Sequence, residues 1–228
     1  MSLPVVAVTN VSTCASDPQV KAALTALQRQ VSEQFRAYWN VDCGLTFLEK
    51  GQALADGWWQ MVVMDEPDQP GAYGYHEMSA QGTPLGKVFA GLDVRMGTSW
   101  TVTLSHELLE MLADPWVNWC AQTPEGKIYA LEVCDPVEAD EAGYEIDGVL
   151  VSDFVTPAWF EPMGAERVDF GRRLSRGREI AAGGYASVLD PEKGWEQITT
   201  GQTLPEAPLG SRRQKRAMRR EEWERSER

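Results

Sequence analysis

The sequence predicts an α+β fold over most of its length, followed by a basic tail. Short apolar strands alternate with two long amphipathic helices, which is typical of a sheet covered by helices. Hydrophobic residues make up 43% and charged residues 24% of the 228 residues, as in a chain that buries a core. We expect one domain over residues 1–190, then an extended linker and a basic, arginine-rich tail over residues 191–228.

The first half of the chain has the order strand, helix, three strands, helix. Residues 5–8 form a short apolar run typical of a buried strand. Asp17 is the expected N-cap of the first helix, with Pro18 at the first helical position. Apolar residues then recur at helical spacing up to about Trp39. The next three strands are predicted over residues 45–48, 59–64 and 87–94, with a turn-rich loop over residues 68–74 between the last two.

The second long helix is predicted over residues 100–113. Asp114 ends it, because a residue that precedes proline is pushed out of the α region. Residues 144–151 are typical of a hairpin with a tight Asp-Gly turn. The sequence is turn-rich beyond Gly183, and we expect little packed structure from Pro205 onward. The C-terminal half is therefore predicted to be irregular.

The second helix carries a possible metal-binding motif. His106 and Glu110 are four residues apart, so on a helix they share one face and can bind a single ion. Glu107 lies beside them, where it can act as general base on a water bound to that ion. This is the HExxH zinc helix with glutamate in place of the second histidine. The alternative is that these side chains are ordinary solvent-facing charges, because HExxE alone is a weak motif.

A third ligand normally comes from a later segment of the chain. Residues 131–138 contain a dense group of carboxylates at a suitable distance, with Glu132 and Asp135 as the two candidates. The apolar neighbours of Glu132 indicate partial burial, whereas the alternative is an exposed acidic loop. The sequence leaves the choice between the two candidates open.

Several other residues are candidates for supporting roles. His76 is the only other histidine, and it could stabilise an oxyanion, bind the metal, or be a loop histidine with a local hydrogen bond. Asp114 could orient the ligands or cap the following turn. We expect Trp116, Trp119 and Trp159 to fill the core under the site rather than to bind substrate.

Three motifs in this region resemble the pattern SHELxE…(D/N)PxxNxW…ExxD of HExxE zincin-like proteins. They are residues 105–110, residues 114–119 and residues 132–135. That pattern occurs in the secreted plant Exordium-like family and in metallopeptidases of bacteriophages and bacteria. The flanking residues 74–76 and 151–160 resemble the phage type more closely. The resemblance covers roughly residues 5–190 and leaves out the tail.

The resemblance implies a zincin-like fold, with a mixed twisted sheet and a metal-binding active-site helix. It implies a zinc metallopeptidase, a hydrolase that cleaves peptide bonds with a metal-activated water and Glu107 as base. The implied ligands are His106, Glu110 and either Glu132 or Asp135, with His76 as a second catalytic candidate. One imidazole with two carboxylates makes the ion a weaker Lewis acid than two imidazoles would, and it lowers the preference for zinc over other divalent cations.

The charge distribution motivates an alternative without catalysis. Residues 210–228 contain 8 Lys/Arg and 4 Asp/Glu, whereas the preceding residues contain 13 basic and 30 acidic residues. The acidic body argues against nucleic-acid binding by the core. A basic tail could dock to structural proteins of a phage virion, with the metal stapling two segments of a non-enzymatic zincin fold. A third reading is a binding protein that recognises a peptide or sugar without hydrolysing it.

The sequence also bears on location. No apolar run approaches the roughly 18 residues needed to cross a bilayer, and residues 1–8 lack the basic region of a secretory signal. We therefore expect no membrane partner, and a location in the bacterial host cytoplasm or in the virion. The four cysteines form no CxxC pair, so we expect them to be reduced.

Overall fold

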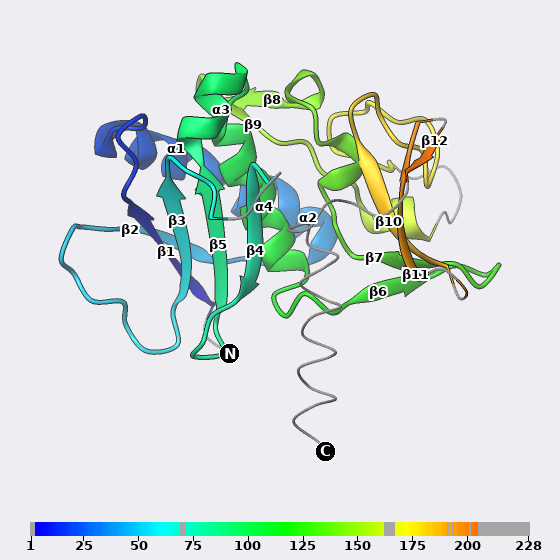
Figure 1. The fold of residues 1–228 in the computed structure, drawn as a ribbon, viewed down its shortest axis with the longest axis horizontal. Coiled ribbons are helices and arrows are strands. Elements are labelled where there is room, and N and C mark those ends of the chain that lie inside the picture. Colours follow the sequence, from blue (N-terminus) through cyan, green and yellow to red (C-terminus); the bar gives the residue numbers. More distant parts are fainter. Residues whose placement is uncertain are drawn as a thin grey trace.

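The structure is a computed structural model that describes residues 3–68, 72–161, 167–190, 192, 194–200 and the backbone of 202–204. It confirms the predicted α+β class (Figure 1). The described strands form two five-stranded sheets and one two-stranded sheet. No helix in these ranges is long and apolar enough to span a membrane.

The N-terminal sheet is mixed, as predicted, with the order β2-β1-β3-β5-β4. Its strands are β1 (Val5–Asn10), β2 (Gly44–Leu48), β3 (Trp59–Met64), β4 (Gly74–Met78) and β5 (Pro84–Phe89). Four of them run parallel, and β4 is antiparallel to β5 at one edge. On β3, Met61 and Val63 are fully buried while their neighbours are half-buried. This alternation shows that helices cover one face of the sheet.

The first long helix has three parts: α1 (Asp17–Arg29), a π-helical segment (Gln30–Phe35) and α2 (Arg36–Trp39). Its end at Trp39 confirms the prediction, but its N-cap is Ser16 rather than Asp17. Ser16 still has extended backbone angles, and its N–H donates to Oε1 of Gln19 over 2.9 Å. The carboxylate of Asp17 instead accepts a hydrogen bond from Asn10. Asp17 is the first helical residue, so the helix begins one residue earlier than expected.

Two predictions in the middle of the chain were wrong. The strand expected over residues 87–94 is β5, which starts earlier and ends at Phe89, and α3 (Ala90–Met96) follows it. Gly91 lies against Asp65 so closely that a Cβ there would be 2.7 Å from the Asp65 carbonyl oxygen, and the N–H of Leu92 donates to that oxygen. This contact lies at the point where β5 ends and α3 begins. Strand β4 was not predicted, so four strands rather than three lie between the two long helices.

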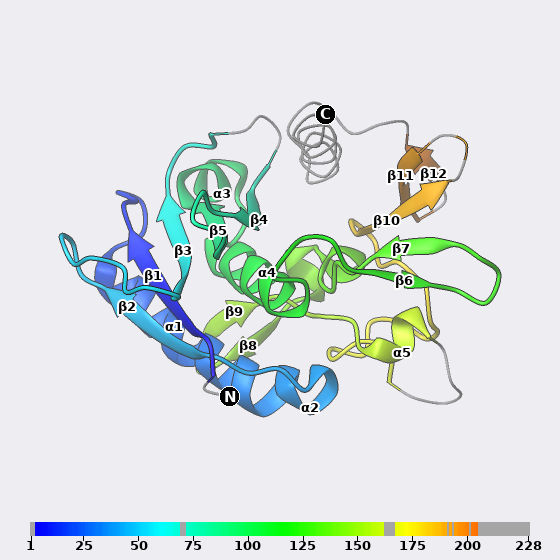
Figure 2. The ribbon, with the colours of Figure 1, turned by 90° about the horizontal axis from the view of Figure 1, so that it is seen from below.

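The second long helix, α4 (Trp100–Ala113), has the predicted bounds. It runs through the middle of the molecule, between the N-terminal sheet and the C-terminal elements (Figures 1 and 2). It packs against β4 and β5 on one side and against β9 (Val149–Val151) on the other. Because it is enclosed in this way, even its polar residues from Ser105 to Glu110 are buried.

The C-terminal half is more regular than predicted. Strands β8 (Tyr144–Ile146) and β9 confirm the hairpin, and Asp147 and Gly148 have the positive φ angles, 52° and 79°, that its tight turn requires. A second sheet has the order β12-β11-β10-β7-β6 and is antiparallel. Its strands are β6 (Cys120–Gln122), β7 (Ile128–Ala130), β10 (Tyr185–Asp190), β11 (Gly194–Thr199) and β12 (Gln202–Leu204).

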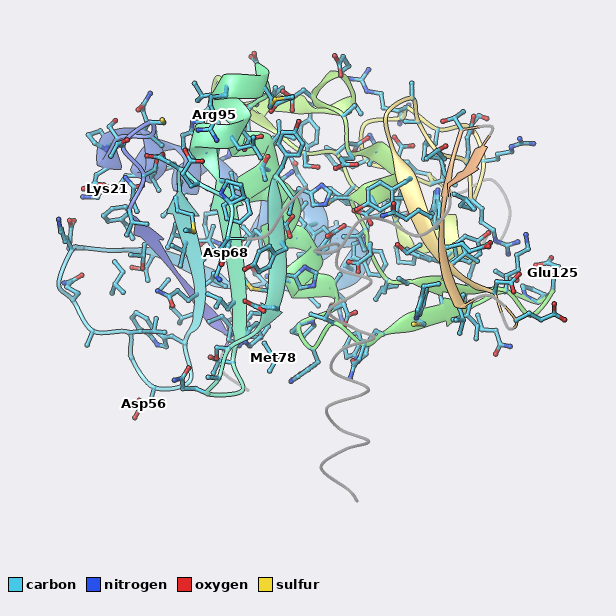
Figure 3. All side chains as sticks on the ribbon, viewed as in Figure 1. Lys21, Asp56, Asp68, Met78, Arg95 and Glu125 are labelled. Carbon is cyan, nitrogen blue, oxygen red and sulfur yellow. The ribbon has the colours of Figure 1, made fainter. Side chains whose placement is uncertain are left out.

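This second sheet continues past residue 190, where the sequence analysis placed the start of a linker. The predicted basic tail over residues 210–228 lies outside the described residues. At the two ends of the molecule, Glu125 lies at the tip of the β6–β7 hairpin and Asp56 lies on the loop between β2 and β3 (Figure 3).

One hydrophobic core joins the two halves of the described chain. Buried residues from β1, α1, α4, β10 and the short helix α5 (Pro157–Phe160) belong to a single cluster. Trp159 is buried in it, as predicted, whereas Trp116 and Trp119 are 50% and 47% exposed, so their predicted core positions were wrong. The four cysteines are free thiols, as expected.

Candidate metal centre

Helix α4 brings three of the predicted site residues together. His106 and Glu110 face each other across one turn, with Nε2 of His106 3.3 Å from Oε1 of Glu110. Glu107 follows His106 directly, and all three side chains are at least 94% buried. Ordinary solvent-facing charges would be exposed, so the alternative reading of this motif was wrong.

The segment after β7 brings both candidate third ligands to the same place. Oδ1 of Asp135 lies 3.3 Å from Nε2 of His106. Glu132 can offer an oxygen within 4.8 Å of ligand atoms of both Glu110 and His76. Both carboxylates are buried, so this segment is no exposed acidic loop. The N–H of Cys134 donates to Oε1 of Glu110 over 3.1 Å, which ties the segment to α4.

His76 approaches the cluster from β4. It is 1% exposed and lies in a strand, so it is no loop histidine. Its Nε2 lies 3.3 Å from the carbonyl oxygen of Asp114, an acceptor that assigns the proton to Nε2. Its Nδ1 lies 3.6 Å from Oε2 of Glu107 and 4.0 Å from Oε2 of Glu110. Nδ1 of His76 therefore faces the carboxylates.

The described residues include two sets that could hold a metal ion, each with ligand atoms within 4.8 Å of one another. One set is His106, Glu110 and Cys134, and the other is His76, Glu110 and Glu132. Around a tetrahedral zinc ion with bonds of about 2.0 Å, neighbouring ligand atoms are roughly 3.3 Å apart. The two distances from His106 Nε2, to Glu110 and to Asp135, both equal 3.3 Å. Both sets, and these two distances from His106, are compatible with a bound divalent cation.

The electrostatics of the cluster are dominated by burial. Burial raises the pKa of Asp135, although His106 and Tyr185 hydrogen-bond to its carboxyl and lower it. Burial also raises the pKa of Glu138 to about 7 and that of the Cys134 thiol to about 12. The pKa of Tyr185 is raised by burial and then by the carboxylates around it, Asp135 first. A cation would stabilise the ionised forms of these carboxyls.

Glu138 and Tyr185 were not predicted as site residues. Glu138 lies in the acidic segment over residues 131–138, but it is not part of the ExxD motif over residues 132–135. Tyr185 begins β10, a strand that was not predicted, and no signal in the sequence linked it to the site.

A buried polar network holds α4 in place next to the ligands. The hydroxyl of Ser105 donates to Oε1 of Gln30 over 2.7 Å and accepts a hydrogen bond from the N–H of Ser152 over 3.1 Å. Nε2 of Gln30 donates to the carbonyl oxygen of Ser152. Gln30 belongs to the π-helical segment, a local irregularity that often marks functional regions. Ser105 thus joins α4 to the first helix and to the end of β9.

Close packing brings β4 against α4. A Cβ on Gly74 would lie 2.8 Å from Cγ2 of Thr103 and 2.9 Å from Cγ of Glu107. Only glycine allows this approach. Two residues later the strand presents His76 to the cluster, so Gly74 sets the distance between His76 and Glu107.

Asp114 ends α4 and shapes the next turn. Its carboxylate accepts hydrogen bonds from the N–H groups of Asn118 and Trp119, each over 3.0 Å. Its carbonyl oxygen faces His76, so this residue both caps the turn and orients a site residue. The turn points outward, and the rings of Trp116 and Trp119 lie 6.0 Å apart on the surface.

The structure therefore brings all six predicted site residues into one buried cluster. They are His76, His106, Glu107, Glu110, Glu132 and Asp135. We also compared the chain with models of protein families, with curated proteins and with solved structures, and none of these comparisons finds a match.

Proposed function

We propose that the protein is a zinc-dependent metallopeptidase of the HExxE, zincin-like type. One observation supports this most. On a buried helix, Nε2 of His106 lies 3.3 Å from a carboxylate oxygen of Glu110 and equally close to one of Asp135. Glu107 is the next residue after His106 on the same helix. The mixed sheet with an antiparallel edge strand next to the helix is compatible with a zincin-like arrangement. The proposed substrate is a peptide or protein, and the proposed location is a bacterial host cell or a phage virion.

The proposed zinc ligands are His106, Glu110 and Asp135. Glu132 instead belongs to the set with His76 and Glu110. A bound divalent cation would supply a more acidic water and would polarise the scissile carbonyl. Zinc is proposed over harder cations because an imidazole is in the set, although the carboxylates weaken this preference.

Glu107 is the proposed general base. Glu107 is the residue directly after the proposed ligand His106, and its carboxylate lies in the same cluster. From there it can accept a proton from the attacking water and pass it to the leaving amine. Its environment is buried, which strengthens electrostatic interactions with the reacting groups. His76 is less suited to stabilise an oxyanion, because its Nε2–H is directed at the carbonyl oxygen of Asp114.

Glu107→Gln tests the proposal. The purified full-length variant should keep its zinc and lose at least about 100-fold in the cleavage of a peptide library, measured by mass spectrometry. Glu33→Gln, on the exposed side of the first helix, serves as the matched control and should cleave like the wild type. Equal cleavage by Glu107→Gln and the wild type would overturn the assignment of the base.

A second candidate function is a metal-stapled structural or assembly protein of a phage virion. It is favoured by the origin of the candidate ligands, which come from β4, from α4 and from the segment after β7. An ion bound by all three segments would cross-link them. A wild-type protein that binds zinc, loses thermal stability on chelation and cleaves no peptide of the library would support this function instead.

A further inference from the structure

We propose that the cluster binds two divalent cations, with the carboxylate of Glu110 bridging them. The first cation is the one in the proposed function, bound by His106, Asp135 and Oε1 of Glu110. The second is bound by His76, Glu132 and Oε2 of Glu110. The inference rests on the proposed function for its first cation and adds a second metal position to the same site.

The orientation of Glu110 is the first argument for a bridge. Its Oε1 lies 3.3 Å from Nε2 of His106, and its Oε2 lies 4.0 Å from Nδ1 of His76. The two imidazoles fall in different metal-binding sets, and Glu110 is the residue that both sets share. A carboxylate with one oxygen directed to each of two imidazoles is placed to bind one cation on each side.

The environment of His76 is the second argument, and it is independent of the acidic residues. The ring is buried, and its Nε2 is satisfied by the carbonyl oxygen of Asp114. Its Nδ1 makes no hydrogen bond with any described residue. A histidine that binds a metal through one nitrogen commonly donates its other N–H to a backbone carbonyl. His76 has this arrangement.

The distances around Nδ1 of His76 suit a cation. The nearest oxygens of Glu107 and Glu110 lie 3.6 Å and 4.0 Å away, which is too far for a hydrogen bond. A divalent cation between Nδ1 and these oxygens would attract both the nitrogen and the carboxylates. Ligand atoms on one divalent cation are roughly 3 to 4 Å apart, so such a charge would fit.

Charge balance is the third argument. The cluster contains five carboxyl groups, those of Glu107, Glu110, Glu132, Asp135 and Glu138, and one divalent cation balances only two of the negative charges that they can carry. Two divalent cations carry four positive charges. Ions removed from water need compensation by opposite charge, so two cations suit this buried set better than one. In hydrolases with two metals, the second ion helps to stabilise the attacking and leaving groups.

The metal content of the full-length protein tests the proposal without relying on activity. The protein is stripped with a chelator, loaded with Zn²⁺ or Mn²⁺, desalted, and its metal counted by plasma mass spectrometry. We expect two ions per chain in the wild type and one in His76→Ala and in Glu132→Gln. Glu77→Gln is the matched control, because Glu77 follows His76 on β4 but pairs with Lys87. It should bind two ions.

The outcomes separate the two proposals. One ion in the wild type would overturn the second cation and leave the proposed function intact. Two ions in the wild type and in both site variants would also overturn it, because the second ion would then lie elsewhere. No ion in the wild type would overturn both. If the variants do not fold, anomalous scattering from wild-type crystals decides: two peaks roughly 3.5–4 Å apart support the proposal, and one peak overturns it.

Discussion

Nε2 of His106 lies 3.3 Å from Oε1 of Glu110, one turn away on α4. The same nitrogen lies 3.3 Å from Oδ1 of Asp135, so two buried carboxylates converge on one imidazole. A cation bound there stabilises the folded state, because the unfolded chain has no preformed site.

Removal of the metal should therefore lower thermal stability. At a zinc concentration about 1,000 times the dissociation constant, binding contributes about 4 kcal/mol, or roughly 10 °C in Tm for a chain of this size. Calorimetry of the zinc-loaded protein with and without chelator measures the difference. Identical melting curves would contradict the metal site.

Ser105→Ala should destabilise the protein by about 2–4 kcal/mol. The change leaves Oε1 of Gln30 and the N–H of Ser152 buried without the hydroxyl that satisfies both. Urea denaturation measures the loss, and Ser187→Ala on β10 provides a control that removes a hydroxyl from a half-buried strand position. If both variants unfold at the same urea concentration as the wild type, the network does not hold α4.

Gly74→Ala should weaken zinc binding and lower stability by about 1–3 kcal/mol. The new methyl group would meet Thr103, Glu107 and the carbonyl oxygen of Lys87 at 3.0 Å or less, so β4 must move away from α4. Titration calorimetry with zinc measures the affinity. Gly44→Ala on β2 is the matched control, since nothing lies within 4 Å of its Cβ position. Unchanged affinity in Gly74→Ala would mean that this contact does not position the site.

The pH dependence of stability should include a contribution from Asp153. Burial, and then the adjacent Asp169, raise the pKa of Asp153 from 3.8 to about 8. The unfolded chain releases this proton near pH 4, so the folded protein binds more protons between about pH 4 and pH 8. Stability is therefore lost as the pH rises through this range. Denaturation in urea at a series of pH values measures the slope.

Asp153→Asn should flatten that slope. The amide keeps an oxygen to accept from the N–H groups of Phe154 and Gly171, and its NH₂ can donate to Asp169 at any pH. Asp56→Asn, on the exposed loop between β2 and β3, should leave the slope as it is in the wild type. A slope that is equally steep in the wild type and in Asp153→Asn would contradict this origin of the pH dependence.

The helix that carries the site was predictable from the sequence because its limits are local. Asp114 before proline ends α4 at the predicted residue, and the spacing of His106 and Glu110 follows from the helix itself. The burial of this polar stripe was not predictable. It depends on β4 and on the segment after β7, which pack against α4 from distant parts of the sequence.

The elements that were missed have weak local signals. Strand β4 is short and begins with Gly74, and the β5 strand that pairs with it begins with Pro84. Glycine and proline are rare in strands, so the residues at these strand starts do not have the β-branched composition that is typical of a strand. The outward position of Trp116 and Trp119 depends on hydrogen bonds from the turn to Asp114, which composition does not reveal. The role of Tyr185 depends on a second sheet that brings β10 back to the site.

The central claim is that a metal ion is bound between His106 and Glu110. An anomalous difference map at the zinc absorption edge, from crystals of the full-length protein grown with zinc, tests it most directly. The account predicts a peak about 2 Å from Nε2 of His106 and from a carboxylate oxygen of Glu110. A map with no peak at that position, from crystals in which the protein is otherwise well ordered, would contradict it.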